Sequence, residues 1–164
     1  VVRTKKPIKV KMVEFSYEEP YLVAKLPSGR NIYYKAPRIE KRTIKYRSKE
    51  TGKMETFEKD NLTYMGKQQN GKKWVRLDTH GGKLIENFVQ AIARDILRDG
   101  LLACHHDGFD ISFHVHDEIV AIENIDDEYY TLDRMRELMI GSSPWAKGLP
   151  LGASGFYSSF YKKD

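Results

Sequence analysis

The chain has a single cysteine, Cys104, among its 164 residues, so it cannot form an internal disulfide. This fits a reducing compartment rather than a disulfide-stabilised secreted domain. No apolar run approaches the ~20 residues that a membrane helix needs, and no signal-peptide pattern is present. We therefore expect a cytoplasmic protein with no membrane partner. The chain also lacks an initiator Met and begins Val1-Val2-Arg3, which suggests a piece cut from a longer protein.

The composition, with 40% hydrophobic and 31% charged residues, is that of a globular chain and not of a disordered one. The net charge of +5 is unevenly distributed. Residues 1–76 contain 20 Lys and Arg against 8 Asp and Glu, a net of +12, whereas residues 77–164 have a net of −7. A basic half of this kind indicates a polyanionic partner, although lysine-rich solvated hairpins would give the same count.

Residues 8–77 have the pattern of antiparallel strands and turns. The segment IKVKMVEF alternates apolar and polar residues, and YLVAKL and NIYYK follow it. Turn signals occur at Pro27-Ser28-Gly29, Glu50-Thr51-Gly52 and Asn70-Gly71. The pattern predicts a meander of strands, many with one face in solvent.

A helix is predicted over residues 83–104, after the segment DTHGG. Asp78 or Thr79 is expected to cap its start, and Gly108 to end it. The expected buried stripe consists of Leu84, Ile85, Phe88, Ile92 and Ile96. A polar face is expected to contain Lys83, Asn87, Gln90, Arg94 and Arg98.

The octamer FHVHDEIV, residues 113–120, is expected to form a β-hairpin with two carboxylates at its tip. The turn is centred on Asp117-Glu118 or on His116-Asp117, and either register places Phe113 and Val115 on the face of Val120 and Ile122. A second helix is expected at residues 127–140, with an apolar side of Leu132, Met135, Leu138 and Met139, followed by a surface tail without long elements. The fold class is therefore α+β, with antiparallel sheet and hairpins packed against one long and one shorter helix.

The adjacent carboxylates of Asp117 and Glu118 suit a hard divalent cation. Mg²⁺ takes oxygen ligands, retains waters, and is commonly held by one or two carboxylates together with phosphate oxygens. Two such ions about 4 Å apart stabilise the attacking and leaving oxygens of a phosphoryl transfer. A solvated turn with two acidic residues is the simpler interpretation of the octamer taken alone.

Several segments together resemble the C-terminal part of a family A DNA polymerase, the family of bacterial DNA polymerase I, in its phage-type branch. GGKLIENFVQAIARD resembles the helix whose Gln follows the minor groove of primer–template, and HVHDEIV resembles the third polymerase motif on a palm hairpin. LPSGRNIYY resembles the segment that returns from fingers to palm. PWAKGLPLGASGF and FYKKD resemble the C-terminus of phage-type members.

The resemblance implies roles for the residues of the hairpin. Asp117 matches the metal-binding aspartate of the motif, and Glu118 matches the adjacent acid that supports the site. His116 matches the residue near the primer terminus. The implied cofactor is Mg²⁺, or Mn²⁺, with no organic cofactor.

The resemblance also implies roles for the polar face of the long helix. Gln90 matches the minor-groove glutamine. Many relatives have Asn one helical turn before it, where this chain has Glu86 with Asn87 beside it, so either of the two is a candidate for DNA contact. Lys83 and Arg94 are expected to contact phosphate, and this expectation rests on helical geometry alone.

The resemblance implies that the chain 1–164 is a single C-terminal palm fragment, mainly β-hairpins over 1–77 and helices with the hairpin over 78–164. The second metal aspartate, the nucleotide-binding fingers helix and the exonuclease acids of the family have no match here. The expected partners are primer–template DNA, deoxynucleoside triphosphates and the upstream fingers, thumb and exonuclease parts. The parent would synthesise DNA in a phage-infected or prophage-bearing bacterium, and the fragment alone is expected to be inactive.

Two other functions remain open from the residues. The first is a metal-dependent hydrolase or nuclease, because potential ligands crowd together at Cys104, His105, His106, Asp107, His114 and His116, although no closed zinc spacing is present. The second is a non-catalytic basic module that binds nucleic acid and stacks bases on Tyr33, Tyr34, Tyr46, Tyr64 and Trp74, for which a role in the core is the simpler explanation.

Overall fold

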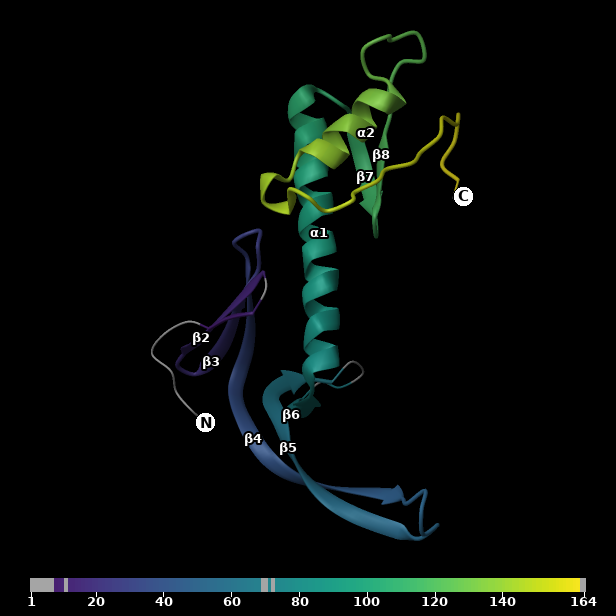
Figure 1. Cartoon of the computed structure of the whole chain (residues 1–164). Coiled ribbons are helices and arrows are strands. Elements are labelled where there is room, and N and C mark those ends of the chain that lie inside the picture. The colour runs from purple at the N-terminus through teal and green to yellow at the C-terminus, as the bar shows by residue number, and fades with distance from the viewer. Residues whose placement is uncertain (1–7, 11, 69–70, 72, 163–164) are drawn as a thin grey trace. The chain divides into compact units, whose positions relative to one another are not determined.

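A computed structural model describes residues 8–10, 12–68, 71 and 73–162. These residues form a mixed α+β structure of antiparallel strands and two helices, as the sequence predicts (Figure 1). The chain divides into two compact units, one up to Phe88 and the other from Val89 onward. The description of the whole chain as one palm fragment stays a prediction. Among the described residues, no helix combines the length and apolar character that crossing a bilayer requires.

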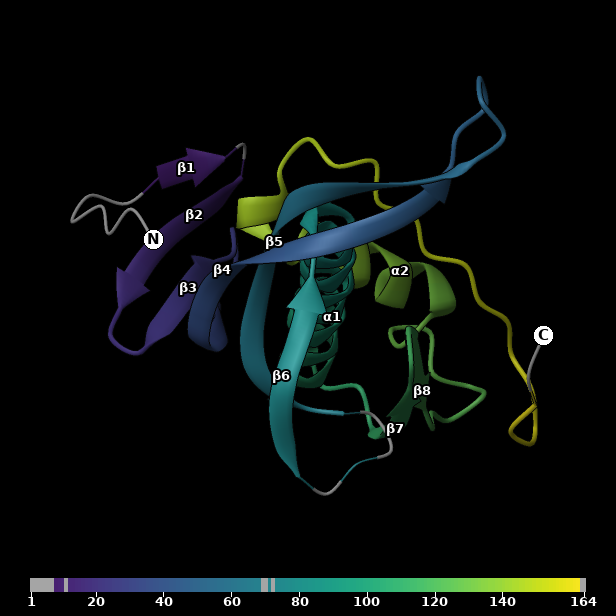
Figure 2. The ribbon, with the colours of Figure 1, turned by 90° about the horizontal axis from the view of Figure 1, so that it is seen from below.

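The first unit contains a six-stranded antiparallel meander in which neighbouring strands follow chain order (Figure 2). Its strands are β1 (Ile8–Val10), β2 (Val13–Glu18), β3 (Tyr21–Lys25), β4 (Asn31–Arg47), β5 (Met54–Lys67) and β6 (Trp74–Thr79). The predicted meander is confirmed. One detail was wrong: IKVKMVEF is not a continuous strand, because Val10 pairs with Val13 and the segment folds back as the β1–β2 hairpin.

Two of the three predicted turns lie within the described residues. Gly29 joins β3 to β4 and Gly52 joins β4 to β5, with φ angles of 84° and 67°. Both are left-handed conformations that glycine adopts without steric cost. The third prediction, Asn70-Gly71, cannot be followed because Asn70 lies outside the described residues.

One face of the sheet packs against the start of helix α1 (Gly81–Asp107). The Phe88 ring meets Phe15 edge to face, with ring centroids 5.7 Å apart. Asn87 Nδ2 donates a hydrogen bond of 3.3 Å to the hydroxyl of Tyr34, whose ring also contacts Tyr64. Tyr34 is buried and Tyr64 is half-buried, so the core role is confirmed for Tyr34. It was wrong for Tyr33, Tyr46 and Trp74, whose side chains are exposed.

The long helix is confirmed, but its predicted start and cap were wrong. Asp78 and Thr79 belong to β6, and the Asp78 carboxylate binds Arg42 and Asn61 across the sheet. The helix begins instead where His80 O accepts from Leu84 N. At the other end, Gly108 has a φ of 110° and ends the helix as predicted.

The predicted buried stripe of α1 is confirmed with one exception. Phe88 is buried, and Leu84, Ile92 and Ile96 are half-buried. Ile85 is 62% exposed, so its prediction was wrong. Ile85 lies one residue beyond Leu84, about 100° around the helix, and falls outside the strip through which Phe88 contacts the sheet.

The second unit packs helix α2 (Leu132–Gly141) against the C-terminal part of α1. Gly100 allows a close approach, since a Cβ atom there would lie 3.2 Å from Met139 Cα. The guanidinium of Arg134 donates two hydrogen bonds, of 2.5 and 3.1 Å, to the Asp107 carboxylate. The predicted start of α2 at residue 127 was wrong, because Thr131 caps the helix by accepting from Arg134 N.

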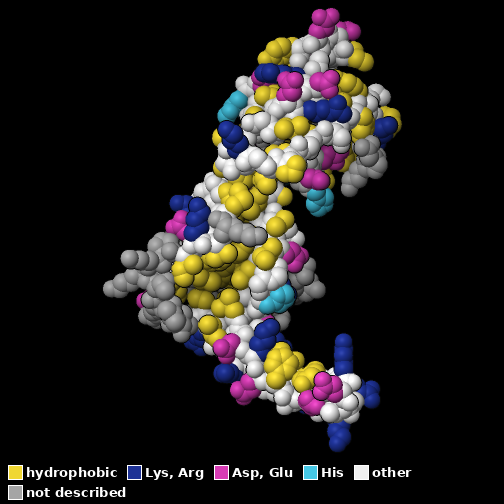
Figure 3. Space-filling model, viewed as in Figure 1, with side chains coloured by type: hydrophobic (Ala, Val, Ile, Leu, Met, Phe, Trp, Pro, Cys, Tyr) yellow, Lys and Arg dark blue, Asp and Glu magenta, His cyan; other side chains and the backbone are white. Residues whose placement is uncertain are grey.

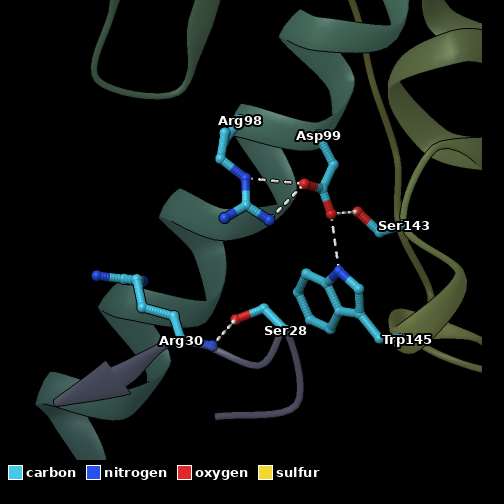
Figure 4. A network of polar contacts seen from close by, with 6 residues as sticks. All are labelled: Ser28, Arg30, Arg98, Asp99, Ser143 and Trp145. Atoms are coloured by element: carbon cyan, nitrogen blue, oxygen red, sulfur yellow. Dashed lines mark hydrogen bonds and ion pairs between the residues drawn. The ribbon is translucent and has the colours of Figure 1, made fainter.

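As far as residue 162, where the described residues end, the segment after α2 contains only a short 3-10 turn, η1 (Pro144–Ala146), as predicted for the tail. Asp99 of α1 holds this segment through hydrogen bonds (Figure 4). One of its carboxylate oxygens accepts from Ser143 Oγ at 3.0 Å and from Trp145 Nε1 at 2.7 Å. Arg98 donates to the other oxygen. Burial pushes the pKa of Asp99 up, but the hydrogen bonds from these three residues outweigh burial and hold the pKa below its ordinary value.

Candidate functional site

The predicted hairpin is present as strands β7 (Ile111–Val115) and β8 (Glu118–Ala121) of a two-stranded sheet. Val115 pairs with Glu118, so His116 and Asp117 alone form the turn. Of the two registers that the sequence allowed, the structure has the one centred on His116-Asp117. Phe113 pairs with Val120, which confirms their shared face. Ile122 lies beyond the end of β8.

The turn is unusual in its chemistry. His116 has a φ of 51°, a left-handed conformation that is uncommon for residues other than glycine, although histidine adopts it more often than most. Two-residue hairpins normally place glycine or asparagine where φ is positive. Strained residues of this kind cluster at functional sites, where the surrounding structure maintains them. His116 and Asp117 are both exposed at this turn.

The two carboxylates differ in their surroundings. Glu118 is half-buried in β8, and one of its oxygens accepts a hydrogen bond of 3.3 Å from the Tyr161 hydroxyl. Tyr161 also meets the ring of Phe113 edge to face, at a centroid distance of 5.1 Å. Burial, followed by the charge and hydrogen bond of Glu118, raises the pKa of Tyr161. In the described part of the chain, Asp117 makes no hydrogen bond or ion pair, so its carboxylate is available to a ligand.

Sequence reasoning missed Tyr161. It is separated from Glu118 by 43 positions, in a tail without regular structure, and no periodicity links the two residues. The resemblance of FYKKD to a polymerase C-terminus was the one signal that singled out this segment.

The predicted DNA-facing residues of α1, Lys83, Glu86, Asn87, Gln90 and Arg94, are all exposed. Asn87 is held by its hydrogen bond to Tyr34. Arg94 Nη2 lies 3.3 Å from Nε2 of His114, which connects this face of the helix to the hairpin. His114 pairs with Ile119, so the Arg94 contact is on the face of the hairpin opposite Glu118.

The ligands of the transition-metal alternative are not assembled. Cys104 is fully buried beneath α2, and burial raises the pKa of its thiol to about 11, so the metal-binding thiolate is disfavoured. Asp107 is engaged by Arg134, which is the first cause of its lowered pKa. No group of three or more His, Cys, Asp or Glu side chains suited to a metal occurs in the portion of the chain that the structure describes.

Comparison with known proteins gives one informative match. The chain is 42% identical, over 164 residues and 99% of its length, to a protein named DNA polymerase from Bacillus phage SP02. No family model matches the chain. No solved structure matches it either. The alignment covers 23% of the phage protein, so the chain is similar over nearly its whole length to less than a quarter of a phage DNA polymerase.

Proposed function

We propose that the chain is the C-terminal palm part of a phage-type family A DNA polymerase and acts in template-directed DNA synthesis. The observation that carries the proposal is the exposed Asp117 carboxylate on a strained two-residue turn, directly followed by the Glu118 carboxylate. The identity of 42% to a phage protein named DNA polymerase supports it. The reaction joins a primer 3′-hydroxyl to a deoxynucleoside triphosphate and releases pyrophosphate, in the cytoplasm of a bacterial host.

The carboxylate donors of the turn fit Mg²⁺, or Mn²⁺, as the metal. Asp117 has no competing partner among the described residues, and Glu118 is oriented by Tyr161. Two carboxylates leave room for the waters and phosphate oxygens with which Mg²⁺ completes its coordination. Asp117 would hold the ion and Glu118 would support it. When bound, the metal lowers the pKa of the primer hydroxyl and neutralises phosphate charge.

Other residues would position the DNA. In this proposal His116 lies near the primer end, and Gln90 reads the minor groove together with Asn87 or Glu86. The minor groove presents similar acceptors for all base pairs, so the neutral amides of Gln90 and Asn87 suit a check of shape without a choice of sequence. Lys83 and Arg94 contact phosphate. The second metal-binding aspartate, the fingers, the thumb and the exonuclease come from upstream parts of the polymerase.

Primer extension with Asp117→Ala tests the proposal. In the full-length polymerase that contains this chain, loss of the metal-binding carboxylate should reduce extension about 10³-fold or more, which corresponds to several kcal/mol of transition-state stabilisation. Duplex binding should remain, because binding rests mainly on phosphate contacts. Asp126→Ala, another exposed aspartate, is the matched control. The 164-residue chain alone should show no extension, and full activity of the Asp117 variant would refute the assignment.

Two alternatives differ in the same assay. The basic half of the sequence and the exposed sheet also suit a non-catalytic nucleic-acid-binding module, for which Asp117 and Glu118 would be dispensable. A metal-dependent nuclease would shorten the labelled primer when nucleotides are omitted. Degradation by the chain alone, abolished in the Asp117→Ala variant, would favour that second function.

A further inference from the structure

Strands β4 and β5 extend well beyond the rest of the six-stranded sheet. Strand β3 pairs with β4 as far as Lys35, and β6 pairs with β5 from Leu62 onward. From the pair Glu40–Asn61 to the pair Arg47–Met54, eight consecutive pairs have no third strand beside them among the residues that the structure describes. Residues 40–61 therefore form a two-stranded ribbon. At ~3.4 Å per residue it is about 24 Å long.

The ribbon is held firmly at its base and along its length. At the base, Asp78 of β6 binds Arg42 and accepts from Asn61 Nδ2 at 2.8 Å. Farther out, the Tyr46 and Phe57 rings meet edge to face at 5.7 Å. The Tyr46 hydroxyl donates to Glu55 at 2.8 Å. An isolated two-stranded hairpin is only marginally stable in water, so these contacts explain why the segment stays paired.

The outer part of the ribbon is strongly cationic. Between residues 45 and 53 it has Lys45, Arg47, Lys49 and Lys53 against one acid, Glu50. Arg47 donates to the carbonyl of Gly52. Within the described residues, no carboxylate lies at ion-pair distance from Lys45, Lys49 or Lys53. Figure 3 shows Lys and Arg side chains projecting on more than one side of this end of the ribbon.

Opposite faces of the ribbon both present cations. Lys45 lies on one face with Arg47 and with Lys41, which is paired with Asp60, because side chains alternate along a strand. Lys59 lies on the other face, opposite Arg42, which is bound to Asp78, and Lys49 and Lys53 lie at the turn. A flat anionic surface would meet cations on one face alone. A groove between two phosphate strands surrounds an inserted element with negative charge, and the major groove of a DNA duplex, about 12 Å wide, admits a two-stranded β-ribbon.

We propose that the β4–β5 ribbon is a DNA-binding arm that enters a groove of duplex DNA and contacts phosphates through Lys45, Lys49 and Lys53. The arm is distinct from the β7–β8 turn and from the polar face of α1. The proposal rests on the proposed function for the identity of its partner, double-stranded DNA. It adds a second region of contact that contributes affinity and not chemistry.

The test is duplex binding by the 164-residue chain, measured by fluorescence anisotropy over a range of salt concentrations. The triple variant Lys45→Ala, Lys49→Ala, Lys53→Ala should reduce the slope of log affinity against log salt by about 3, about one per lost phosphate contact. The matched control neutralises three exposed lysines outside the ribbon, Lys9, Lys25 and Lys147. The control should leave the slope nearly unchanged.

A shortened variant, in which Asn-Gly replaces residues 43–58, removes the arm but keeps the Arg42–Asp78 base. It should lose as much salt dependence as the triple variant. The proposal would be overturned by an unchanged slope in either variant or by an equal loss of slope in the control. It would also be overturned if the chain bound single strands more tightly than duplex, or if the unaltered chain did not bind duplex. Asp117→Ala reports on the catalytic proposal separately, through primer extension with duplex binding retained.

Discussion

Removal of the Asp99 carboxylate should destabilise the second unit strongly. This carboxylate is 15% exposed and accepts from Ser143 and Trp145, which anchors η1 to α1 (Figure 4). Hydrogen bonds to a charged group contribute about 1.5–3 kcal/mol each, and we take the lower value because water reaches the group. The Arg98 pair is more exposed and adds about 0.5 kcal/mol or less. Alanine recovers about 0.6 kcal/mol of helix propensity. The net expected loss for Asp99→Ala is therefore about 2.5–3 kcal/mol.

Urea unfolding followed by tryptophan fluorescence measures this loss. The chain has two tryptophans, so the Trp74→Phe background leaves Trp145, which contacts Asp99 directly, as the reporter. With a slope of about 1–2 kcal/mol per molar urea, the midpoint should fall by roughly 1.5–3 M. Asp126→Ala, in an exposed loop, should change the free energy of unfolding by less than about 0.5 kcal/mol. Equal effects of the two substitutions would refute the anchoring role.

The dependence on pH provides an independent check. The pKa of Asp99 is lowered in the folded chain, so its stabilising contribution is fully present above the ordinary aspartate value of about 3.9. The contribution is lost as the pH falls through the lowered pKa. The difference in unfolding free energy between the unaltered chain and Asp99→Ala should therefore narrow as the pH falls below about 4. A difference that stays constant there would contradict the charged role of the carboxylate.

Three further predictions concern the hairpin and the helix ends. Thr131→Ala should cost about 1 kcal/mol of stability in urea unfolding, because the side chain caps α2, while Thr131→Ser retains most of it. Gly108→Ala should cost about 1–3 kcal/mol, because the φ of 110° is strained for alanine; Gly152→Ala, which has open space and no positive φ, should cost much less in the same assay. Glu118→Gln should lower the pKa of Tyr161 in an NMR titration but leave it above its ordinary value, because burial is the larger cause; an unchanged pKa would disprove the contact.

The sequence by itself determined the elements that depend on local chemistry. Period-two alternation predicted the strands, and glycine-containing turn signals predicted the turns at Gly29 and Gly52. The left-handed backbone at these two glycines needs no distant partner. The stripe of α1 was predicted through Phe88 and its neighbours for the same reason. The adjacency of Asp117 and Glu118 also needed no structure. Local rules failed at Asp78, which suits a helix cap but is bound by Arg42 across the sheet.

The tertiary structure decided which side chains meet across long separations. It selected the His116-Asp117 register, left Asp117 exposed, and brought Tyr161 to Glu118 from the tail. It also showed that Lys45, Lys49 and Lys53 lie together at the outer end of the β4–β5 ribbon, which composition alone could not locate. The physical reason is that strand pairing, burial and ion pairing depend on partners brought together by folding, and a sequence pattern records only one side of each contact.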